Sequence, residues 1–155
     1  MESKEKTLVI LKPDALQRNL MADIISRFEK KGLKLVGLKM MSISDALIAR
    51  HYEHHVDKPF FQDLKDFMQS TPVVVMIWQG FEAVQMVRQI LGATSGRKAD
   101  IGTVRGDLSN SVSRNLTHGS DSVETAKQEI KRFFNEDEIF DWNKKDQEDV
   151  YSSDE

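Results

Sequence analysis

The chain of 155 residues has the size of one domain, and it contains no cysteine, which excludes disulfide bonds, thiolate catalysis and cysteine-ligated zinc. Its net charge of −3 is uneven, because positions 135–155 hold nine acidic residues and two lysines, a net of −7, and the preceding body therefore carries +4. A body this weakly basic suits a small polyanionic ligand, whereas a nucleic-acid-binding surface needs a strongly basic stripe.

The chain shows no signal for membrane insertion or export. No apolar run approaches the roughly 18–20 residues that a membrane-spanning helix needs. Met1–Lys6 is charged and lacks the pattern of a signal peptide. We therefore expect no membrane partner and a cytoplasmic location.

The first third of the chain alternates strand and helix patterns. A short buried strand is predicted at Thr7–Leu11, and it ends at Lys12-Pro13-Asp14 because proline cannot donate to a strand ladder. One helix is predicted from about Asp14 to Gly32, with apolar residues at helical spacing: Leu16, Leu20, Ile24, Ile25 and Phe28. A second strand is predicted at Leu33–Met41, with two faces formed by Leu33, Leu35 and Gly37 and by Val36, Leu38 and Met40.

The rest of the body continues this alternation. Short helices are predicted from Ser44 to about His55 and after Pro59, followed by the strongly β-branched strand Pro72–Trp78 and a helix that Gly92 closes. Residues 92–113 show little periodicity and predict a long loop, which in a compact domain is usually functional or disordered. A short strand at Asn115–His118 and a helix at Ser122–Phe134 complete the body.

The order β-α-β-(α-α)-β-α-β-α resembles the split β-α-β pattern of ferredoxin-like domains. We therefore predict an α+β sandwich in which helices cover a four-stranded antiparallel sheet. Residues 1–134 form the predicted domain, and residues 135–155 form an acidic C-terminal segment that is partly ordered or a tail. Four residues could anchor that segment, which either wraps a neighbour or frays: Ile139, Phe140, Trp142 and Tyr151.

The stretch Asn115–Ser122 is the most informative part of the chain, because it places His118 just ahead of a predicted helix start. A neutral imidazole is a good nucleophile, and its ordinary pKa of about 6.5 leaves it mostly neutral at pH 7. Ser120 or Asp121 can cap the helix, with Glu124 completing a capping box, and a helix start favours a nearby phosphate. Taken alone, the stretch fits a histidine that meets a phosphoryl group or a structural histidine.

Further segments in order along the chain decide between these interpretations. They are Lys12-Pro13-Asp14, Tyr52, Lys58-Pro59-Phe60-Phe61, Arg88, Gly92-Ala93-Thr94, Gly102-Thr103-Val104-Arg105-Gly106-Asp107, and Asn115 through Ser122. Together they resemble the nucleoside diphosphate kinases across nearly the whole chain. The resemblance implies a ping-pong enzyme in which the pros nitrogen of His118 takes the γ-phosphate of a nucleoside triphosphate, usually ATP, and passes it to a nucleoside diphosphate.

The resemblance also implies a role for each matching residue. The phosphate ligands would be Lys12, Tyr52, Arg88, Thr94 and Arg105. Phe60 and Val112 would sandwich the base, Lys12 and Asn115 would reach the ribose 3′-OH, and Glu129 with Ser120 would orient the imidazole. Mg²⁺ would be held through the nucleotide phosphates and water, without a protein metal cage. A homohexamer is expected, with a homotetramer as the alternative.

Several alternatives remain open at the level of sequence. Phe60 could belong to the core, Arg88 could be a solvated charge, and His51, His54 and His55 could be a solvated or phosphate-adjacent cluster rather than metal ligands. Gly96 and Ile101 stand where prolines are expected in many relatives, and Ser113 where glycine is usual, so the loop could be more mobile. Two rival functions are a nucleotide sensor without turnover and a single-stranded nucleic-acid binder.

Overall fold

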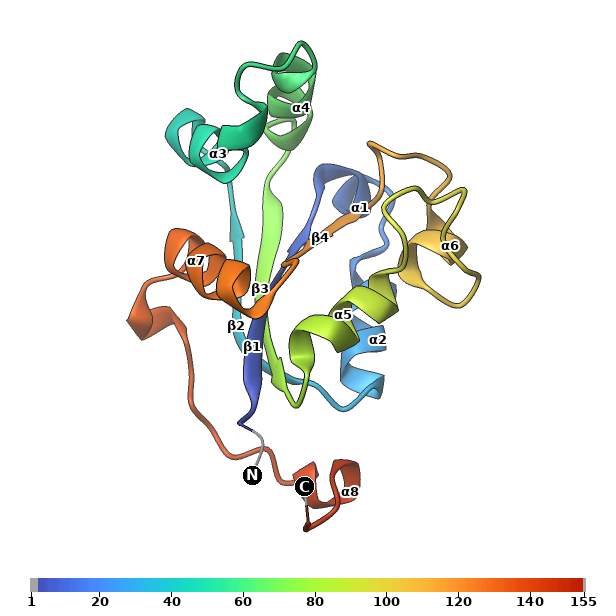
Figure 1. Cartoon of the computed structure of the whole chain (residues 1–155), viewed down its shortest axis with the longest axis vertical. Helices are drawn as coiled ribbons and strands as arrows, with labels where there is room; N and C mark the ends of the chain where they lie inside the picture. Colours follow the sequence, from blue (N-terminus) through green and yellow to red (C-terminus); the bar gives the residue numbers. More distant parts are fainter. Residues whose placement is uncertain (1–2, 155) are drawn as a thin grey trace.

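The computed structural model describes residues 3–154. Positions 1 and 2 of the predicted domain and position 155 of the predicted C-terminal segment lie outside the described residues. Its centre is a four-stranded antiparallel sheet of order β2-β3-β1-β4 (Figure 1). The strands are β1 (Glu5–Leu11), β2 (Lys34–Met41), β3 (Val73–Gly80) and β4 (Thr117–Gly119). Because β3 lies between β1 and β2, and β1 lies between β3 and β4, both β-α-β units are split, which confirms the predicted fold class.

Helices cover both faces of this sheet (Figure 1). They are α1 (Pro13–Gln17), α2 (Met21–Lys30), α3 (Asp45–His51), α4 (Phe61–Met68), α5 (Ala83–Leu91), α6 (Val104–Leu108), α7 (Val123–Phe133) and α8 (Gln147–Val150), with short 3₁₀ turns η1 (Glu53–His55) and η2 (Glu136–Glu138). Within residues 3–154, no helix has both the length and the apolar character to cross a bilayer.

Strand β1 lies at the middle of the sheet and contributes to two separate cores. Val9 and Leu11 pack with α1, α2 and α5 on one face, whereas Leu8 and Ile10 pack with α3, α4 and α7 on the other. Successive side chains of a strand point to opposite faces, and here both faces are covered, so β1 reads as a continuous apolar run. Residues 7–11 of β1 are all buried, so this part of the strand is a rigid support for residues at its end.

The prediction of one helix from Asp14 to Gly32 is wrong, because the chain forms two helices, α1 and α2, with a break between them. Asn19 adopts a left-handed conformation with φ 57°, and Leu20 donates its N–H to the carbonyl of Ala15 at 3.0 Å. Asparagine tolerates this conformation better than most residues. The apolar residues keep a common side after the break, so their spacing alone did not reveal it.

Strand β2 contains a bulge that changes its predicted faces. Leu35 pairs with Trp78 and Gly37 with Ile77, so Val36 is the extra residue. After the bulge, Leu38 faces the same side as Leu35 rather than the opposite one. The predicted alternation across Leu33–Met41 is therefore wrong beyond Leu35.

Two further predictions are corrected near the site. The segment 92–113 is not all loop, because α6 begins after Thr103, whose hydroxyl accepts the N–H of Gly106 at 3.0 Å. Helix α7 is capped by Ser122, which accepts the N–H of Thr125 at 3.1 Å, and neither Ser120 nor Asp121 caps it. Ser120 is thereby left to contact other side chains.

The C-terminal segment packs along its own chain. Phe140 donates its N–H to Val36 at 2.8 Å, and the Trp142 indole donates to the carbonyl of Leu35 at 2.9 Å, both beside the bulge of β2. Further along, the Lys4 ammonium lies 4.8 Å from the centre of the Tyr151 ring. The described part of residues 135–155 therefore covers one end of the edge strand β2.

Candidate active site

A strained turn leads into β4 and sets the position of His118. Leu116 has φ 71°, and the N–H of Thr117 bonds to the carbonyl of Asn115 at 2.8 Å, which closes a three-residue turn. The carboxylate of Asp14 holds this turn by accepting the N–H of Leu116 at 3.0 Å. Such strain is found where surrounding structure requires a special backbone path, often at functional sites.

The imidazole of His118 is oriented by a carboxylate on α7. Its Nε2 lies 2.7 Å from Oε2 of Glu129, while the hydroxyl of Ser120 donates to Oε1 of Glu129 at 2.6 Å. Burial opposes the charge on Glu129, but the hydrogen bond and charge of His118 and the bond from Ser120 outweigh it, so the pKa of this carboxyl lies below its ordinary value. An ionised carboxylate only accepts, so Nε2 carries the proton and Nδ1 keeps a free lone pair.

The half-buried Lys12 and the buried Arg105 bring positive charge to the same place. The Lys12 ammonium donates to Oδ1 of Asn115 at 2.8 Å, directly after β1. Burial, and then the charge of Arg105, lowers the pKa of Lys12 to about 8. The Arg105 guanidinium is fixed by three backbone carbonyls, those of Asn115, Gly92 and Thr117, at 3.3, 2.8 and 2.7 Å. Burial lowers the pKa of Arg105 to about 10, so it stays charged at neutral pH.

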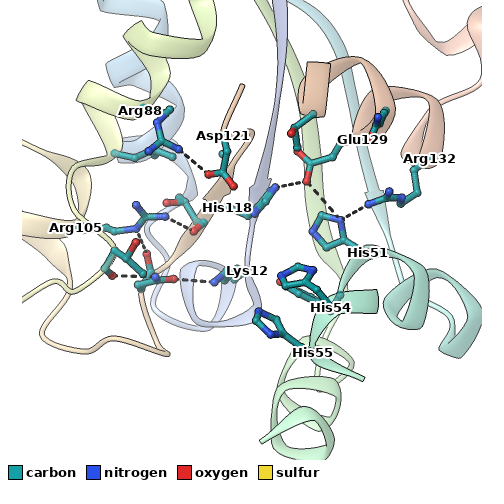
Figure 2. Close-up of a pocket in the computed structure, with 18 of the residues that line it drawn as sticks. Lys12, His51, His54, His55, Arg88, Arg105, His118, Asp121, Glu129 and Arg132 are labelled. Atoms are coloured by element: carbon teal, nitrogen blue, oxygen red, sulfur yellow. Dashed lines mark hydrogen bonds and ion pairs between the residues drawn. The ribbon is translucent and has the colours of Figure 1, made fainter. Parts of the chain in front are cut away.

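These side chains line a cavity of about 620 Å³, which we call the His118 cavity (Figure 2). A second cavity of about 880 Å³ opens beside it, and we call it the Phe60 cavity. The two cavities adjoin, since five of the residues that line the first also line the second: Lys12, Tyr52, His55, Thr94 and Asn115. One elongated ligand can therefore occupy both.

The Phe60 cavity differs from the first in its apolar walls. Phe60 and Val112 are 48% and 50% exposed, so neither belongs to the core. Phe60 lies at the N-terminus of α4, and its ring meets that of His55 with centroids 5.1 Å apart. An exposed aromatic ring facing an exposed aliphatic side chain suits a flat heterocycle.

The predicted residues fall into three places. Lys12, Tyr52, Arg88, Thr94, Arg105, Asn115 and Glu129 line the His118 cavity around His118 itself, and Phe60 and Val112 line the Phe60 cavity. Ser120 lies fully buried behind His118 and reaches neither cavity. The structure thus brings the whole predicted set together, from segments more than 100 positions apart.

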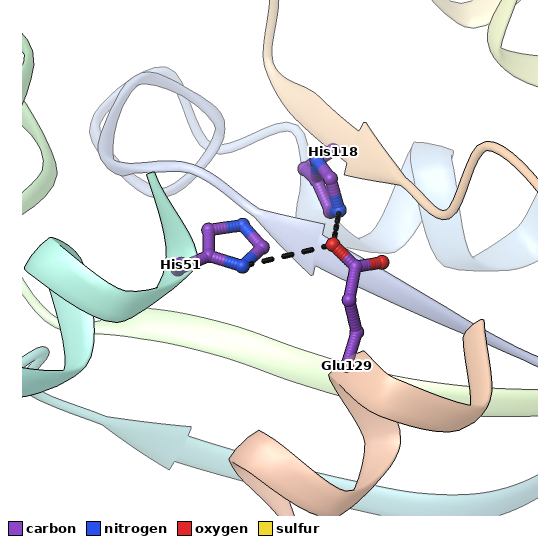
Figure 3. A group of neighbouring side chains, drawn as sticks. All are labelled: His51, His118 and Glu129. Carbon is purple, nitrogen blue, oxygen red and sulfur yellow. Dashed lines mark hydrogen bonds and ion pairs between the residues drawn. The ribbon is translucent and has the colours of Figure 1, made fainter. Parts of the chain in front are cut away.

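Sequence reasoning missed His51, which is buried rather than solvated. Its ring lies against that of His118, with centroids 4.8 Å apart, and its Nδ1 lies 3.6 Å from Oε2 of Glu129 (Figure 3). The Arg132 guanidinium also reaches Nδ1 of His51, at 3.1 Å. The signal was present in the helical register, since His51 follows Ile48, the other buried residue of α3, by three positions and so lies on the same face.

His51, His118 and Glu129 form the one group of three potential metal ligands found within residues 3–154 (Figure 3). Two ring nitrogens and one carboxylate do not suit Mg²⁺, which prefers six oxygen ligands. The Arg132 guanidinium also occupies Nδ1 of His51, where a cation would be repelled. The trio is better described as a hydrogen-bonded support for His118 than as a metal centre.

Comparison with known proteins gives a consistent result. Residues 5–139 match the family model described as nucleoside diphosphate kinase. The chain is 52% identical over 151 residues to the nucleoside diphosphate kinase of Parabacteroides distasonis, covering 97% of this chain and 99% of that one. It is 52% identical over 142 residues to that of Pyrococcus abyssi, covering 90% and 89%.

Solved structures give the same picture. A halophilic nucleoside diphosphate kinase from Halobacterium salinarum in complex with CDP superposes with a TM-score of 0.93 at 46% identity, covering 96% of this chain and 99% of that one. A nucleoside diphosphate kinase family protein from Babesia bovis has a TM-score of 0.91 at 39% identity, covering 95% and 99%.

Proposed function

This chain belongs to the nucleoside diphosphate kinase family, a family of phosphotransferases, and from that premise we propose that it works by a ping-pong mechanism through His118. In the first half-reaction, Nδ1 of His118 forms a bond to the γ-phosphorus, and the bond from that phosphorus to the β–γ bridging oxygen breaks. A nucleoside diphosphate then leaves. In the second half-reaction, a terminal oxygen of another nucleoside diphosphate attacks the phosphorus and the N–P bond breaks.

The observation that carries this proposal is the hydrogen bond of 2.7 Å between His118 and Glu129. It keeps the proton on Nε2, so Nδ1 is the nucleophilic atom, and the carboxylate stabilises the positive charge that the ring gains as the N–P bond forms. Ser120 holds the second carboxylate oxygen at 2.6 Å. Glu129 therefore serves both to orient the ring and to stabilise its charge.

The cations of the His118 cavity would bind the phosphates. Phosphoryl transfer proceeds through a loose transition state, and catalysis is mostly positioning and charge stabilisation. Lys12 and Arg105 are held by hydrogen bonds in the free protein, so they cost little reorganisation, and Arg88, Tyr52 and Thr94 add donors around them. Mg²⁺, when bound through phosphate oxygens and water, would neutralise part of the same charge.

The Phe60 cavity would receive the nucleoside. The base would stack between Phe60 and Val112, and the ribose 3′-OH would lie near Lys12 and Asn115, where the two cavities join. A ring face makes no hydrogen bond to the edge of a base, and every base has a flat face that can stack, so such a site tolerates every base. The halophilic relative named above was solved with CDP, a pyrimidine nucleotide, which is consistent with such tolerance.

We propose a homohexamer, with a homotetramer as the alternative. Leu38 and Met40 are 53% and 62% exposed on the edge strand β2. An exposed apolar edge strand favours pairing with another copy. Ile101, 85% exposed in the segment 92–113, is a second apolar point for assembly. Light scattering separates the two oligomers by mass.

Transfer of a labelled γ-phosphate from ATP to the protein, and from the protein to a nucleoside diphosphate, tests the proposal. Incubation with γ-labelled ATP is expected to give a protein-bound label that is stable to alkali and lost in acid, and dTDP should then remove it as dTTP. His118→Ala should abolish both labelling and exchange while ADP still binds. Labelling of the His118→Ala protein, or mass added to another side chain of the wild type, would refute the mechanism. A sensor without turnover would bind ATP and acquire no label.

A further inference from the structure

Arg132 lines the His118 cavity and has no part in the mechanism above. It lies on α7, three residues after Glu129, and its side chain reaches across to the end of α3 (Figure 2). There, Nη1 of Arg132 lies 3.1 Å from Nδ1 of His51. This contact determines which nitrogen of His51 carries the proton.

The direction of that hydrogen bond follows from the chemistry of arginine. A guanidinium has five N–H donors and no acceptor, so Nδ1 of His51 must accept and the ring proton must sit on Nε2. Burial, and then the charge of His118, lowers the pKa of His51 to about 3, so the ring is neutral. Arg132 and Lys12 act in the same direction and Glu129 opposes them.

This tautomer is not the one that His51 would adopt by itself. Nε2 of His51 is buried and has no hydrogen-bond partner within the part of the chain that the structure describes. A buried N–H without a partner is costly. With the proton on Nδ1 instead, the ring could donate toward Oε2 of Glu129, which lies 3.6 Å away. The guanidinium therefore stabilises a tautomer that the surroundings of the ring otherwise disfavour.

The alternative tautomer would disturb His118, because both rings would donate to one oxygen. Oε2 of Glu129 already lies 2.7 Å from Nε2 of His118. A second donor from His51 would draw the carboxylate toward α3 and weaken the first hydrogen bond. That bond is the one that keeps Nδ1 of His118 free to attack.

We propose that Arg132 is a positioning residue, which holds His51 in the Nε2-protonated tautomer and so reserves the Glu129 carboxylate for His118. The inference rests on the proposed role of His118 for its effect on rate, but not for its effect on the His51 tautomer. Arg132 contacts His51, His51 lies beside Glu129, and Glu129 holds His118 (Figures 2 and 3).

The test reads the tautomer directly. Two-dimensional long-range ¹H–¹⁵N correlation spectra of the full chain, at pH 7.5, distinguish a protonated from an unprotonated ring nitrogen for each histidine. In the wild type, His51 should carry its proton on Nε2. In Arg132→Met it should carry the proton on Nδ1, whereas Arg132→Lys, which keeps a charged donor, should restore at least part of the wild-type signal. The matched control is Lys131→Met, an exposed neighbour on α7, which should leave the His51 signals unchanged.

The rate of His118 phosphorylation provides a second measurement. Arg132→Met should lower the rate of His118 phosphorylation by up to about tenfold, the loss expected for one weakened hydrogen bond, with little change in KM for ATP. A merely structural role would lower stability without moving the tautomer. The proposal is overturned if wild-type His51 is protonated on Nδ1, or if Arg132→Met leaves its tautomer unchanged. A wild type that shows the expected tautomer but takes no label would instead contradict the proposed function.

Discussion

The guanidinium of Arg88 and the carboxylate of Asp121 form an ion pair of 2.6 Å at the His118 cavity, which both residues line. Both are well exposed, at 51% and 78% of their side-chain surface. Arg88 is one of the residues that we propose to bind phosphate, so Asp121 occupies a donor that a nucleotide would use. Its charge also offsets that of Arg88 beside the buried Arg105.

Removing the Asp121 charge is therefore expected to strengthen nucleotide binding. In Asp121→Asn, Arg88 no longer has a competing anion and is free to meet a phosphate. Exposed ion pairs contribute about 0.2–1 kcal/mol, so the Kd for ADP should fall by about 1.4-fold to fivefold. Isothermal titration calorimetry measures the change.

The matched control is Asp146→Asn, which removes a carboxylate from another exposed ion pair, with Lys144, away from both cavities. That variant should leave the Kd unchanged. Weaker binding of ADP to Asp121→Asn would show instead that the carboxylate holds Arg88 in a productive position.

The lowered pKa of Lys12 predicts a pH dependence of binding. Lys12 is charged below about pH 8 in the free protein, because burial and the charge of Arg105 lower its pKa to that value. Bound phosphates favour the charged form and raise this pKa, so the complex holds more protons than the free protein above pH 8. Affinity for ADP should therefore be constant below about pH 8 and fall by up to about tenfold per pH unit above it.

Calorimetry at pH 8.5 in two buffers of different ionisation enthalpy should detect proton uptake on binding. Lys12→Met should bind more weakly and lose the uptake, while Lys31→Met, an exposed lysine after α2, should retain it. An affinity for ADP that stays flat from pH 7 to 10 would rule out Lys12 as the titrating phosphate ligand.

The succession of strands along the chain could be predicted from sequence, because β1 and β3 contain apolar runs, and the matching motifs were recognised from the resemblance. Other features depend on single contacts that leave no periodic trace. Asn19 interrupts the helix without disturbing the spacing of apolar residues, and the extra residue at Val36 moves Leu38 to the other face.

In the candidate site, too, some residues could be predicted from the sequence and others could be recognised only in the fold. The resemblance supplied Glu129, although the spacing along α7 gives no reason for it to reach His118. Neither the spacing nor the resemblance supplied Arg132, since its importance arises from the turn of α3 that brings His51 beside it. Contacts between side chains of different elements require the fold before they can be recognised.

Exposure of Phe60 predicts that stacking carries much of the nucleoside binding. Base–aromatic stacking is worth about 1–3 kcal/mol per base, so Phe60→Ala should raise the Kd for nucleoside diphosphates by about 5-fold to 150-fold. Purine and pyrimidine diphosphates should be affected to a similar extent. Competition with a fluorescent nucleotide measures the series, and Phe140→Ala, which removes a 63% exposed ring of the C-terminal segment, is the control. A loss confined to one base would indicate edge recognition instead.

The close packing at Gly96 predicts that this glycine stabilises the segment that carries Arg105. The N–H of Gly96 donates to the carbonyl of Ser111 at 2.9 Å, a bond that proline could not make. A Cβ at this position would lie 2.2 Å from the backbone oxygen of Ser109, so the two backbones would have to separate. Gly96→Ala should therefore lower the free energy of unfolding by about 1–3 kcal/mol, and Gly96→Pro should lower it further.

Urea denaturation at one fixed protein concentration measures both changes, because assembly contributes to the apparent stability. The exposed neighbour Arg97 provides the control, since Arg97→Ala removes no buried contact and should stay within about 0.5 kcal/mol of the wild type. Because Arg105 is fixed partly by the carbonyls of Gly92 and Asn115, which flank this segment, Gly96→Ala should also weaken ADP binding. Wild-type stability in Gly96→Ala would mean that the two backbones separate at no cost.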